Sequence, residues 1–285
     1  MNRAEYYLLD VFTDTPFAGN QLAVFLEADG LETATMQAVA RELNLAETVF
    51  LGAARAANHY PMRIFTPTQE LDFAGHPTVG TAQLLAELGL ASREQTLILQ
   101  PPVGKLPINF AGNKATFTTA RPASISPSTL DTSRAATLLG LQRHQVVGMP
   151  VISSCGLAFH LIELDDLAAL QNIHISGTEW ANTVTPSGAE QVYLYVAESS
   201  GGAETVLRSR MFSREHGLCE DPATGSAAAA LSGYLATTGD ARRWVIHQGV
   251  EMGRPSVIET AMANGLVQVG GNAVLVGKGE IYLQD

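Results

Sequence analysis

The spacing of hydrophobic positions changes repeatedly along the chain between the period of a strand and the period of a helix. Apolar residues at positions 36, 39, 40 and 43 recur at helical spacing, which predicts a helix over 32–43. Asn44 is expected to end this helix, because Asn tolerates the left-handed conformation in which helices commonly end. The other helices are expected near 131–140, 165–171 and 225–238.

Short apolar runs bounded by Gly, Pro, Asn or Asp predict strands between these helices. They are expected near 6–13, 22–26, 48–51 and 61–65, as three strands in 98–117, near 145–152, 157–163, 191–197 and 205–213, and in the tail 244–283. Such an irregular mixture favours an α+β fold over a regular βαβ alternation. The segment 121–130 holds two prolines and four Ser or Thr residues, so we expect it to be a linker.

An internal repeat is the most informative feature of this pattern. Residues 75–89 and 225–239 each begin with Gly, continue as an apolar helix and reach a second Gly fourteen positions later. The tetrads Arg63–Thr66 and Arg210–Ser213 precede them and resemble each other. We interpret the two copies as related halves facing one another; chance similarity between two helices rich in Gly and Ala is the alternative.

Composition and charge narrow the classes of protein that fit. The chain has 285 residues, 46% hydrophobic and 16% charged, which suits two globular domains or one large one. Seventeen basic against 28 acidic residues give a net charge of −11, which is unlike a nucleic-acid-binding surface. No apolar run approaches the roughly 18 residues of a membrane span, and the first residues lack the core of a signal peptide. We therefore expect a cytoplasmic protein.

Two helix starts are the first candidates for chemistry. Gly75-His76 and Gly225-Ser226 would each expose backbone N–H groups at the positive end of a helix dipole, where a carboxylate, phosphate or enolate binds. In the alternative interpretation each Gly only permits a tight turn. His76 can donate to a substrate oxygen or shuttle a proton, unless it is a structural histidine.

Acidic side chains are the second set of candidates. Each copy of the repeat carries an acid between its tetrad and its helix, Asp72 and Asp221. Glu47 lies in an apolar stretch, where burial would raise its pKa and make it an acid or base at neutral pH. A solvent-facing strand position is equally compatible with the pattern. Asp221 is either a second carboxylate of the same site or a capping acid before the helix.

The two cysteines, Cys155 and Cys219, exclude a disulfide framework and a cysteine-rich zinc site. Cys219 lies six residues before Gly225, so we expect a small buried residue and not a thiolate at the helix start. His216 and Cys219 lack the second pair of ligands that a metal site needs. We therefore expect no metal site at these residues.

Seven sequence blocks in a specific order cover almost the whole chain. They are DVFT (10–13), PFAGN (16–20), NLAET (44–48), RIFTPT (63–68), GHPT (75–78), EDPATGSA (220–227), and in the tail QG (248–249) with GRPS (253–256). In this order they resemble the PhzF-like isomerases, a family named for an enzyme of phenazine biosynthesis.

The resemblance implies the diaminopimelate-epimerase fold, with two pseudo-symmetric domains that each wrap a curved, mainly antiparallel sheet or barrel around a central helix. The expected domains are 1–124, joined by a C-terminal strand at about 272–285, and 125–271, with the active site in the cleft between them. Family enzymes isomerise without metal or organic cofactor, often as dimers. We therefore expect a homodimer that takes a small anionic substrate and binds neither nucleic acid nor membrane.

By the same resemblance, seven residues form the site. Glu47 would be the main acid/base; His76, Asp221 and Ser226 would hold and polarise the substrate; Gly75 and Gly225 would offer backbone donors; Asn20 would bind substrate. The racemases and epimerases of this fold carry two cysteines just before the helix-opening glycines. Ala74 and Thr224 hold those positions here, which argues against a two-thiol racemase. Ala74 also departs from the Cys-Gly-His that family members commonly carry.

The expected activity is a cofactor-independent isomerase that moves a proton between carbons of a small carboxylated, unsaturated or cyclic metabolite. An epimerase or dehydratase acting on an amino-acid-like substrate is the second enzyme hypothesis. A non-catalytic small-molecule binding protein on the same scaffold is the third, since a fold alone does not specify a function.

Overall fold

The computed structural model describes residues 2–200, 204–214 and 217–283. The chain divides into two compact units of mixed helices and strands, each described by itself below. Unit 1 comprises Met1–Thr118 and Gly270–Asp285, and unit 2 comprises Thr119–Val269.

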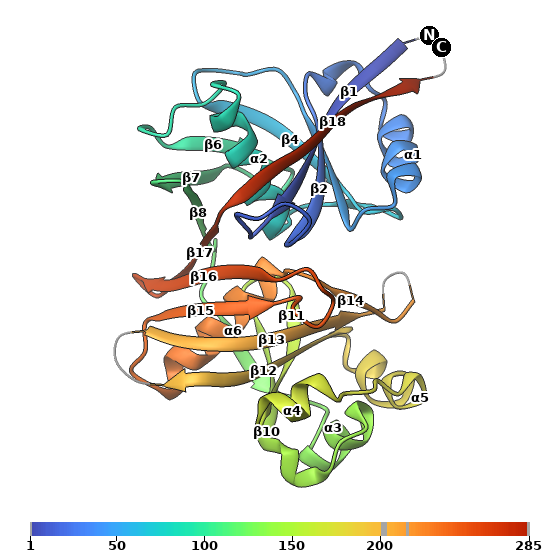
Figure 1. Ribbon diagram of the computed structural model, residues 1–285, viewed down its shortest axis with the longest axis vertical. Helices are drawn as coiled ribbons and strands as arrows, with labels where there is room; N and C mark the ends of the chain where they lie inside the picture. The colour runs from blue at the N-terminus through green and yellow to red at the C-terminus, as the bar shows by residue number, and fades with distance from the viewer. Residues whose placement is uncertain (1, 201–203, 215–216, 284–285) are drawn as a thin grey trace. The chain divides into compact units, whose positions relative to one another are not determined.

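Unit 1 is a strongly twisted sheet with one helix on each of its faces (Figure 1). Its strands are β1 Asn2–Val11, β2 Asn20–Phe25, β3 Glu47–Leu51, β4 His59–Phe65, β5 Glu70–Leu71, β6 Leu97–Gln100, β7 Leu106–Ala111, β8 Lys114–Thr118 and β18 Ala273–Leu283. Its helices are η1 Ala28–Gly30, α1 Thr33–Leu43 and α2 Gly75–Glu87. The last strand of the chain, β18, pairs antiparallel with the first, β1.

Helix α2 is the central helix of unit 1, and its residues from Gly75 to Leu85 are buried. A Cβ at Gly80 would lie 2.6 Å from a methyl carbon of Leu22 and 2.7 Å from one of Val11, so only Gly allows this close approach to β1 and β2. Helix α1 covers the opposite, outer face, where Phe25 and Phe50 stack with ring centroids 4.9 Å apart. Asn44 caps α1 with φ 51°, which confirms it as the end of that helix.

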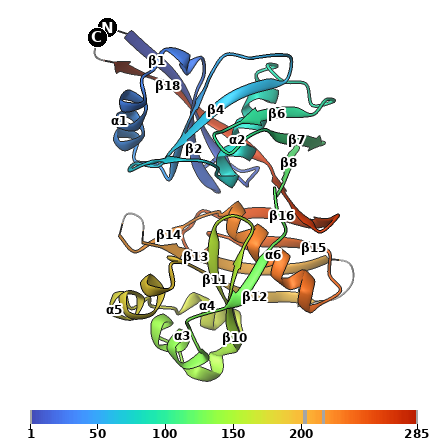
Figure 2. The ribbon, with the colours of Figure 1, turned by 180° about the vertical axis from the view of Figure 1, so that it is seen from behind.

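Unit 2 is a second sheet with a central helix (Figure 2). Its strands are β9 Ser124–Pro127, β10 Val146–Ser154, β11 Ala158–Leu164, β12 Gln191–Ser200, β13 Glu204–Ser213, β14 Cys219–Asp221, β15 Arg243–Gln248, β16 Ser256–Ala263 and β17 Leu266–Gly271. Its helices are α3 Thr132–Leu139, η2 Arg143–Gln145, α4 Leu167–Gln171, α5 Gly177–Glu179, η3 Trp180–Val184, η4 Thr185–Ser187 and α6 Gly225–Thr238. Helix α6 packs on β10, β11, β15 and β16, whereas α3, α4 and η3 bury their apolar residues against the other face of the strands.

The strands of the two units pair in the same order. In unit 1, β2 runs parallel to β3, β3 antiparallel to β4, and β4 parallel to β6. In unit 2, β11 runs parallel to β12, β12 antiparallel to β13, and β13 parallel to β15. Phe65 pairs with Thr48 as Phe212 pairs with Val192. Glu47 and Gln191, each one residue earlier, therefore hold matching positions.

The structure corrects two details of the sequence interpretation. The expected linker 121–130 contains a strand, β9, because its residues 124–127 pair antiparallel with β10. The pairings of β5 and β14 show that the matching acids of the two copies are Glu70, opposite Phe65, and Glu220, opposite Phe212. Asp221 therefore corresponds to Leu71 and not to Asp72.

Among the described residues, no helix is both long and apolar enough to span a bilayer.

His160 is a buried structural histidine of unit 2. Its Nδ1 lies 2.7 Å from Oγ of Ser128 and its Nε2 lies 2.8 Å from Oγ of Ser187, so both ring nitrogens have partners. Burial lowers the pKa of His160 to about 4. The neutral ring is therefore the form that the folded protein holds.

Acidification is expected to weaken the fold through this histidine. In the unfolded chain the pKa of a His is about 6.5. Between that pH and about 4 the unfolded state therefore binds more protons than the folded state. The free energy of unfolding should fall as the pH falls, by about 2 kcal/mol from His160 alone between about pH 7 and pH 5. Urea denaturation at both pH values, with His160→Gln as the control, measures it. An equal fall in the two proteins would contradict this assignment.

Candidate active site

Three of the predicted site residues meet in unit 1. Asn20 begins β2 and Glu47 begins β3, and the two strands are parallel, so both side chains lie at the same end of the sheet. Nδ1 of His76, the second residue of α2, lies 3.3 Å from Oε2 of Glu47 and 3.4 Å from Nδ2 of Asn20. The exposed fraction of the Glu47 side chain is 18% and that of His76 is 5%. Glu47 is thus mostly buried, which the sequence pattern alone left open.

His76 is a neutral imidazole with one unused nitrogen. Burial lowers its pKa to about 3, and a hydrogen bond to the backbone of Gln21 only partly opposes this shift. Nδ1 faces both an acceptor, the Glu47 carboxylate, and a donor, Nδ2 of Asn20, so the tautomer depends on which of the two it pairs with. Within the described part of the chain, Nε2 is buried and has no hydrogen-bond partner.

A buried nitrogen without a partner costs roughly 1–3 kcal/mol, and in native proteins such an atom calls for an explanation. Nε2 belongs to a ring at the first turn of α2 whose other nitrogen contacts a carboxylate. A ligand that forms a hydrogen bond with Nε2 would satisfy it. This atom is therefore the clearest sign of a binding site in unit 1.

The first turn of α2 adds backbone donors to this cluster. The N-cap residue Ala74 is extended (φ −147°, ψ 145°) and makes no side-chain hydrogen bond to the helix. Pro77 has no N–H, which leaves the N–H groups of Gly75 and His76 as the donors of the first turn that no side chain caps. They carry the positive end of the helix dipole and suit an anion.

The other three predicted residues meet in unit 2. Asp221 ends β14, and Gly225 and Ser226 open α6. The N-cap residue Thr224 makes no side-chain hydrogen bond to its own helix, and its Oγ1 instead donates to Oδ2 of Asp221 at 2.5 Å. The N-terminus of α6 is consequently open, like that of α2, and a carboxylate lies beside it.

A buried residue that sequence reasoning did not assign to the site lies behind this cluster. The side chain of Gln248, fully buried, donates from Nε2 to Oγ1 of Thr224 at 2.9 Å and to the carbonyl oxygen of Asp221 at 2.8 Å. Its Oε1 accepts from the backbone N–H of Thr224 at 3.2 Å. The only signal in the sequence was the block at 248–249, which named no role.

Two arginine–glutamate pairs hold the short strands that lead into α2 and α6. Arg63 binds Glu70 through Nε and Nη2 at 2.7 and 2.6 Å, and Arg210 binds Glu220 in the same way at 2.8 and 2.8 Å. Each guanidinium also lies over the ring of a phenylalanine, with centroid distances of 5.0 and 5.1 Å. The bidentate geometry fixes β5 to β4 and β14 to β13, and so sets where each helix begins.

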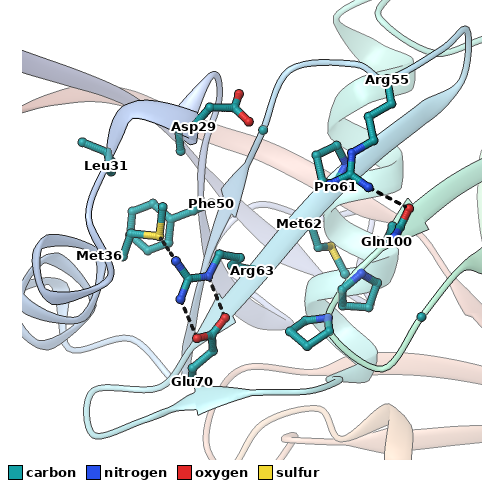
Figure 3. A pocket seen from close by; sticks show the side chains of 15 residues that line it. Asp29, Leu31, Met36, Phe50, Arg55, Pro61, Met62, Arg63, Glu70 and Gln100 are labelled. Carbon is teal, nitrogen blue, oxygen red and sulfur yellow. Dashed lines mark hydrogen bonds and ion pairs between the residues drawn. The ribbon is translucent and has the colours of Figure 1, made fainter.

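A pocket of about 450 Å³ opens on unit 1, away from the predicted site residues and beside the Arg63–Glu70 pair (Figure 3). Met36 and Phe50 line it together with Arg55 and with Arg63, which is paired with Glu70. None of the seven predicted site residues lines this pocket. The predicted site and the hollow of Figure 3 are therefore different places.

The two cysteines, Cys155 and Cys219, differ in their exposure to solvent. Cys219 is exposed, not buried as expected, because β14 presents its side chain to solvent; its Sγ lies 3.7 Å from Oγ of Ser213. Burial raises the pKa of the Cys155 thiol to about 11. His216, weighed as a partner of Cys219, lies outside the described residues. In the described ranges, no group of three or more His, Cys, Asp or Glu side chains could hold a metal ion.

Comparisons with known proteins agree with one another. A family model described as phenazine biosynthesis-like protein matches residues 9–279. An uncharacterized isomerase of Mesorhizobium japonicum is 36% identical over 99% of this chain and 100% of its own length. Trans-2,3-dihydro-3-hydroxyanthranilate isomerase of Pseudomonas fluorescens is 35% identical over 98% of this chain and 99% of its own. A solved phenazine biosynthesis protein of the PhzF family from Bacillus anthracis shares the fold, with a TM-score of 0.89 at 24% identity over 99% of this chain and 100% of that one.

Proposed function

The chain belongs to the family of phenazine biosynthesis-like proteins and is an isomerase, and on this premise we propose that it moves a proton between two carbons of a small carboxylated metabolite. The metabolite is unsaturated or cyclic, and Glu47 removes the proton from one carbon and returns it to another. The single observation that carries this proposal is the buried Nε2 of His76, without a partner among the described residues, on the ring that contacts Glu47.

The reaction balances within the substrate and one side chain. The Glu47 carboxylate takes a proton as a C–H bond breaks, the electron pair shifts through the adjacent double bond, and the protonated Glu47 delivers the proton to the far carbon. No oxidant, reductant or second substrate is consumed. General acid–base catalysis of this kind contributes typically about 10²- to 10⁴-fold to a rate.

His76 has two tasks in this proposal. Its Nδ1 lies 3.3 Å from Oε2 of Glu47 and orients the carboxylate. Its Nε2 forms a hydrogen bond with a polar group of the substrate, as donor or acceptor according to the tautomer. Because the pKa of His76 is about 3, the ring stays neutral across the physiological range and does not compete with Glu47 for the transferred proton.

The charge that develops on the substrate needs donors close by. We assign this role to the N–H groups of Gly75 and His76 at the first turn of α2, where fixed dipoles stabilise a carboxylate or enolate without reorganising. Asn20, at 3.4 Å from the His76 ring, completes the polar side of the cluster. Donors that are fixed before the reaction favour the transition state over the bound substrate.

The proposal extends to unit 2 as a related half of the protein. The common order of strand pairing, the two arginine–glutamate pairs and the two open helix starts support it. Asp221, Ser226 and the N–H groups at Gly225 are assigned to holding and polarising substrate. Gln191 holds the position that matches Glu47, so only unit 1 offers an acid/base there.

Trans-2,3-dihydro-3-hydroxyanthranilate, on which the Pseudomonas fluorescens relative is named to act, is the first compound to test. The protein is incubated in D₂O with this acid and with a panel of small cyclic and unsaturated carboxylic acids. NMR and mass spectrometry then report new C–H positions and incorporated deuterium. A shifted double bond with a proton on the far carbon supports the isomerase.

Product stereochemistry separates the alternatives in the same samples. An inverted centre with the double bond unmoved would identify an epimerase, and loss of water a dehydratase. Binding without any change in the bound acids across the panel would contradict the proposal in favour of a binding protein. Because Ala74 and Thr224 carry no thiol, iodoacetamide should leave turnover unchanged in a Cys219→Ser variant, which lacks the exposed thiol beside Asp221.

A further inference from the structure

The hairpin between β15 and β16 carries the sequence blocks at 248–249 and 253–256, to which the proposed function assigns no role. We propose that Gln248 is a positioning residue, which acts through Thr224 to hold the Asp221 carboxylate in one orientation and to keep the N-terminus of α6 open. This inference rests on the proposed function only for the part that Asp221 plays toward the substrate. The arrangement itself lies entirely within unit 2.

The orientation of the Gln248 amide follows from its partners. The backbone N–H of Thr224 can only donate, so the atom 3.2 Å from it is the oxygen Oε1. The backbone carbonyl of Asp221 can only accept, so the atom 2.8 Å from it is the nitrogen Nε2. One amide therefore binds the segment 221–224 at both of its ends, and it does so with no exposed surface.

These contacts also determine where the hydroxyl of Thr224 donates its proton. It accepts from Nε2 of Gln248 at 2.9 Å, so its own proton donates to Oδ2 of Asp221 at 2.5 Å. A hydroxyl at an N-cap usually accepts from its own helix, which does not happen at α6. Gln248 thereby diverts this hydroxyl to the carboxylate and leaves the first N–H groups of α6 without a side-chain cap.

The chain of donors continues behind Gln248. The Tyr193 hydroxyl donates to Oε1 of Gln248 at 3.1 Å and lies 2.8 Å from Oγ of Ser209, and both residues are fully buried. Burial is the main cause that raises the pKa of Tyr193, and the negative charge of Asp221 raises it further. Every proton in this series points toward the carboxylate, and bonds aligned in this way polarise one another.

Two other residues of the same hairpin, Ser256 and Gly249, pack against Pro222 in the segment 221–224. Oγ of Ser256 donates to the carbonyl oxygen of Pro222 at 2.7 Å and lies 2.9 Å from that of Gln248. A Cβ at Gly249 would lie 2.5 Å from the Pro222 oxygen, so only Gly allows this approach. Unit 1 has no such relay at its helix start, because the N-cap of α2 is Ala74.

The pair Thr224→Val and Thr224→Ser tests the proposal without altering Gln248. Carboxyl ¹³C NMR titration of Asp221 needs no substrate and reads the relay directly. Removing a hydroxyl that donates to the carboxylate should raise the pKa of Asp221 by about 1 in Thr224→Val, and Thr224→Ser should restore it. With the substrate found as above, kcat should fall about 10-fold in Thr224→Val, with a smaller change in KM.

Thr260→Val is the matched control. It removes a buried threonine hydroxyl that lies 2.5 Å from Oγ of Ser232, in the same unit but outside the relay. Its thermal stability should fall like that of Thr224→Val, while the titration of Asp221 stays in place. Gln248→Met should reproduce the change seen in Thr224→Val; should it not fold, the Thr224 pair decides the result.

Three outcomes separate the possibilities. An Asp221 titration unchanged in Thr224→Val overturns the proposal, as does an equal change in Thr260→Val. If the Asp221 titration changes in Thr224→Val but kcat and KM fall or rise together, Gln248 has only a structural role. That result also overturns the proposal. If the wild-type protein turns over no substrate, the proposed function fails, while the NMR result still decides whether Gln248 positions Asp221.

Discussion

Glu47→Gln is expected to lower kcat by about 10³-fold or more while leaving the fold and substrate binding almost intact. The amide has the shape of the carboxylate but cannot take a proton from carbon at neutral pH. An amide can both donate and accept, so Gln at this position can still pair with Nδ1 of His76, and the ring keeps its partner and its orientation. The loss should therefore appear in kcat, whereas KM changes little.

Steady-state kinetics on the substrate identified in D₂O measures this effect, and isothermal titration of the same acid reports binding. Glu42→Gln is the control, because Glu42 is exposed on α1 and its replacement makes the same chemical change away from the site. Thermal unfolding of both variants checks the fold. Near-wild-type turnover in Glu47→Gln would remove Glu47 from its role and with it the proposed mechanism.

Gly249→Ala is expected to destabilise the protein by about 3–4 kcal/mol. Gly249 has φ +72°, where any other residue costs roughly 1–2 kcal/mol. The new Cβ would also lie 2.5 Å from the backbone oxygens of Arg254 and Pro222. Backbone atoms cannot move aside as a flexible side chain can, so the hairpin or the segment after Asp221 must shift.

Gly253→Ala provides the control for this prediction, since Gly253 has the same φ of +72° and nothing within 4 Å of the added Cβ. Gly253→Ala should lower the free energy of unfolding by about 1 kcal/mol, which is the cost of placing Ala at a positive φ. Urea denaturation of the two variants measures the difference, which isolates the close approach of the hairpin to Pro222. Equal destabilisation of both variants would show that this contact does not constrain the protein. Because the contact borders Asp221, Gly249→Ala should also lower kcat.

Elements with a strong local signal were predicted well. The helix expected near 225–238 is α6 from Gly225 to Thr238, and the expected strand 48–51 is β3 from Glu47 to Leu51. The segment 121–130 shows the opposite case. Its Pro and Ser residues suggested a linker, yet β10 offers an edge with which residues 124–127 pair. Partners distant in sequence decide such a strand, so local composition could not reveal it.

For the site, the sequence alone identified which residue types stand at the helix starts, and the order of its blocks indicated the family. Burial of Glu47 and the unused Nε2 of His76 became evident only in the folded chain, because each depends on contacts between β2, β3 and α2. The same holds for Gln248, whose side chain acts 24 residues away from Thr224. A hydrogen bond needs a direction and a distance, and only tertiary packing supplies these; a sequence records spacing along the chain alone.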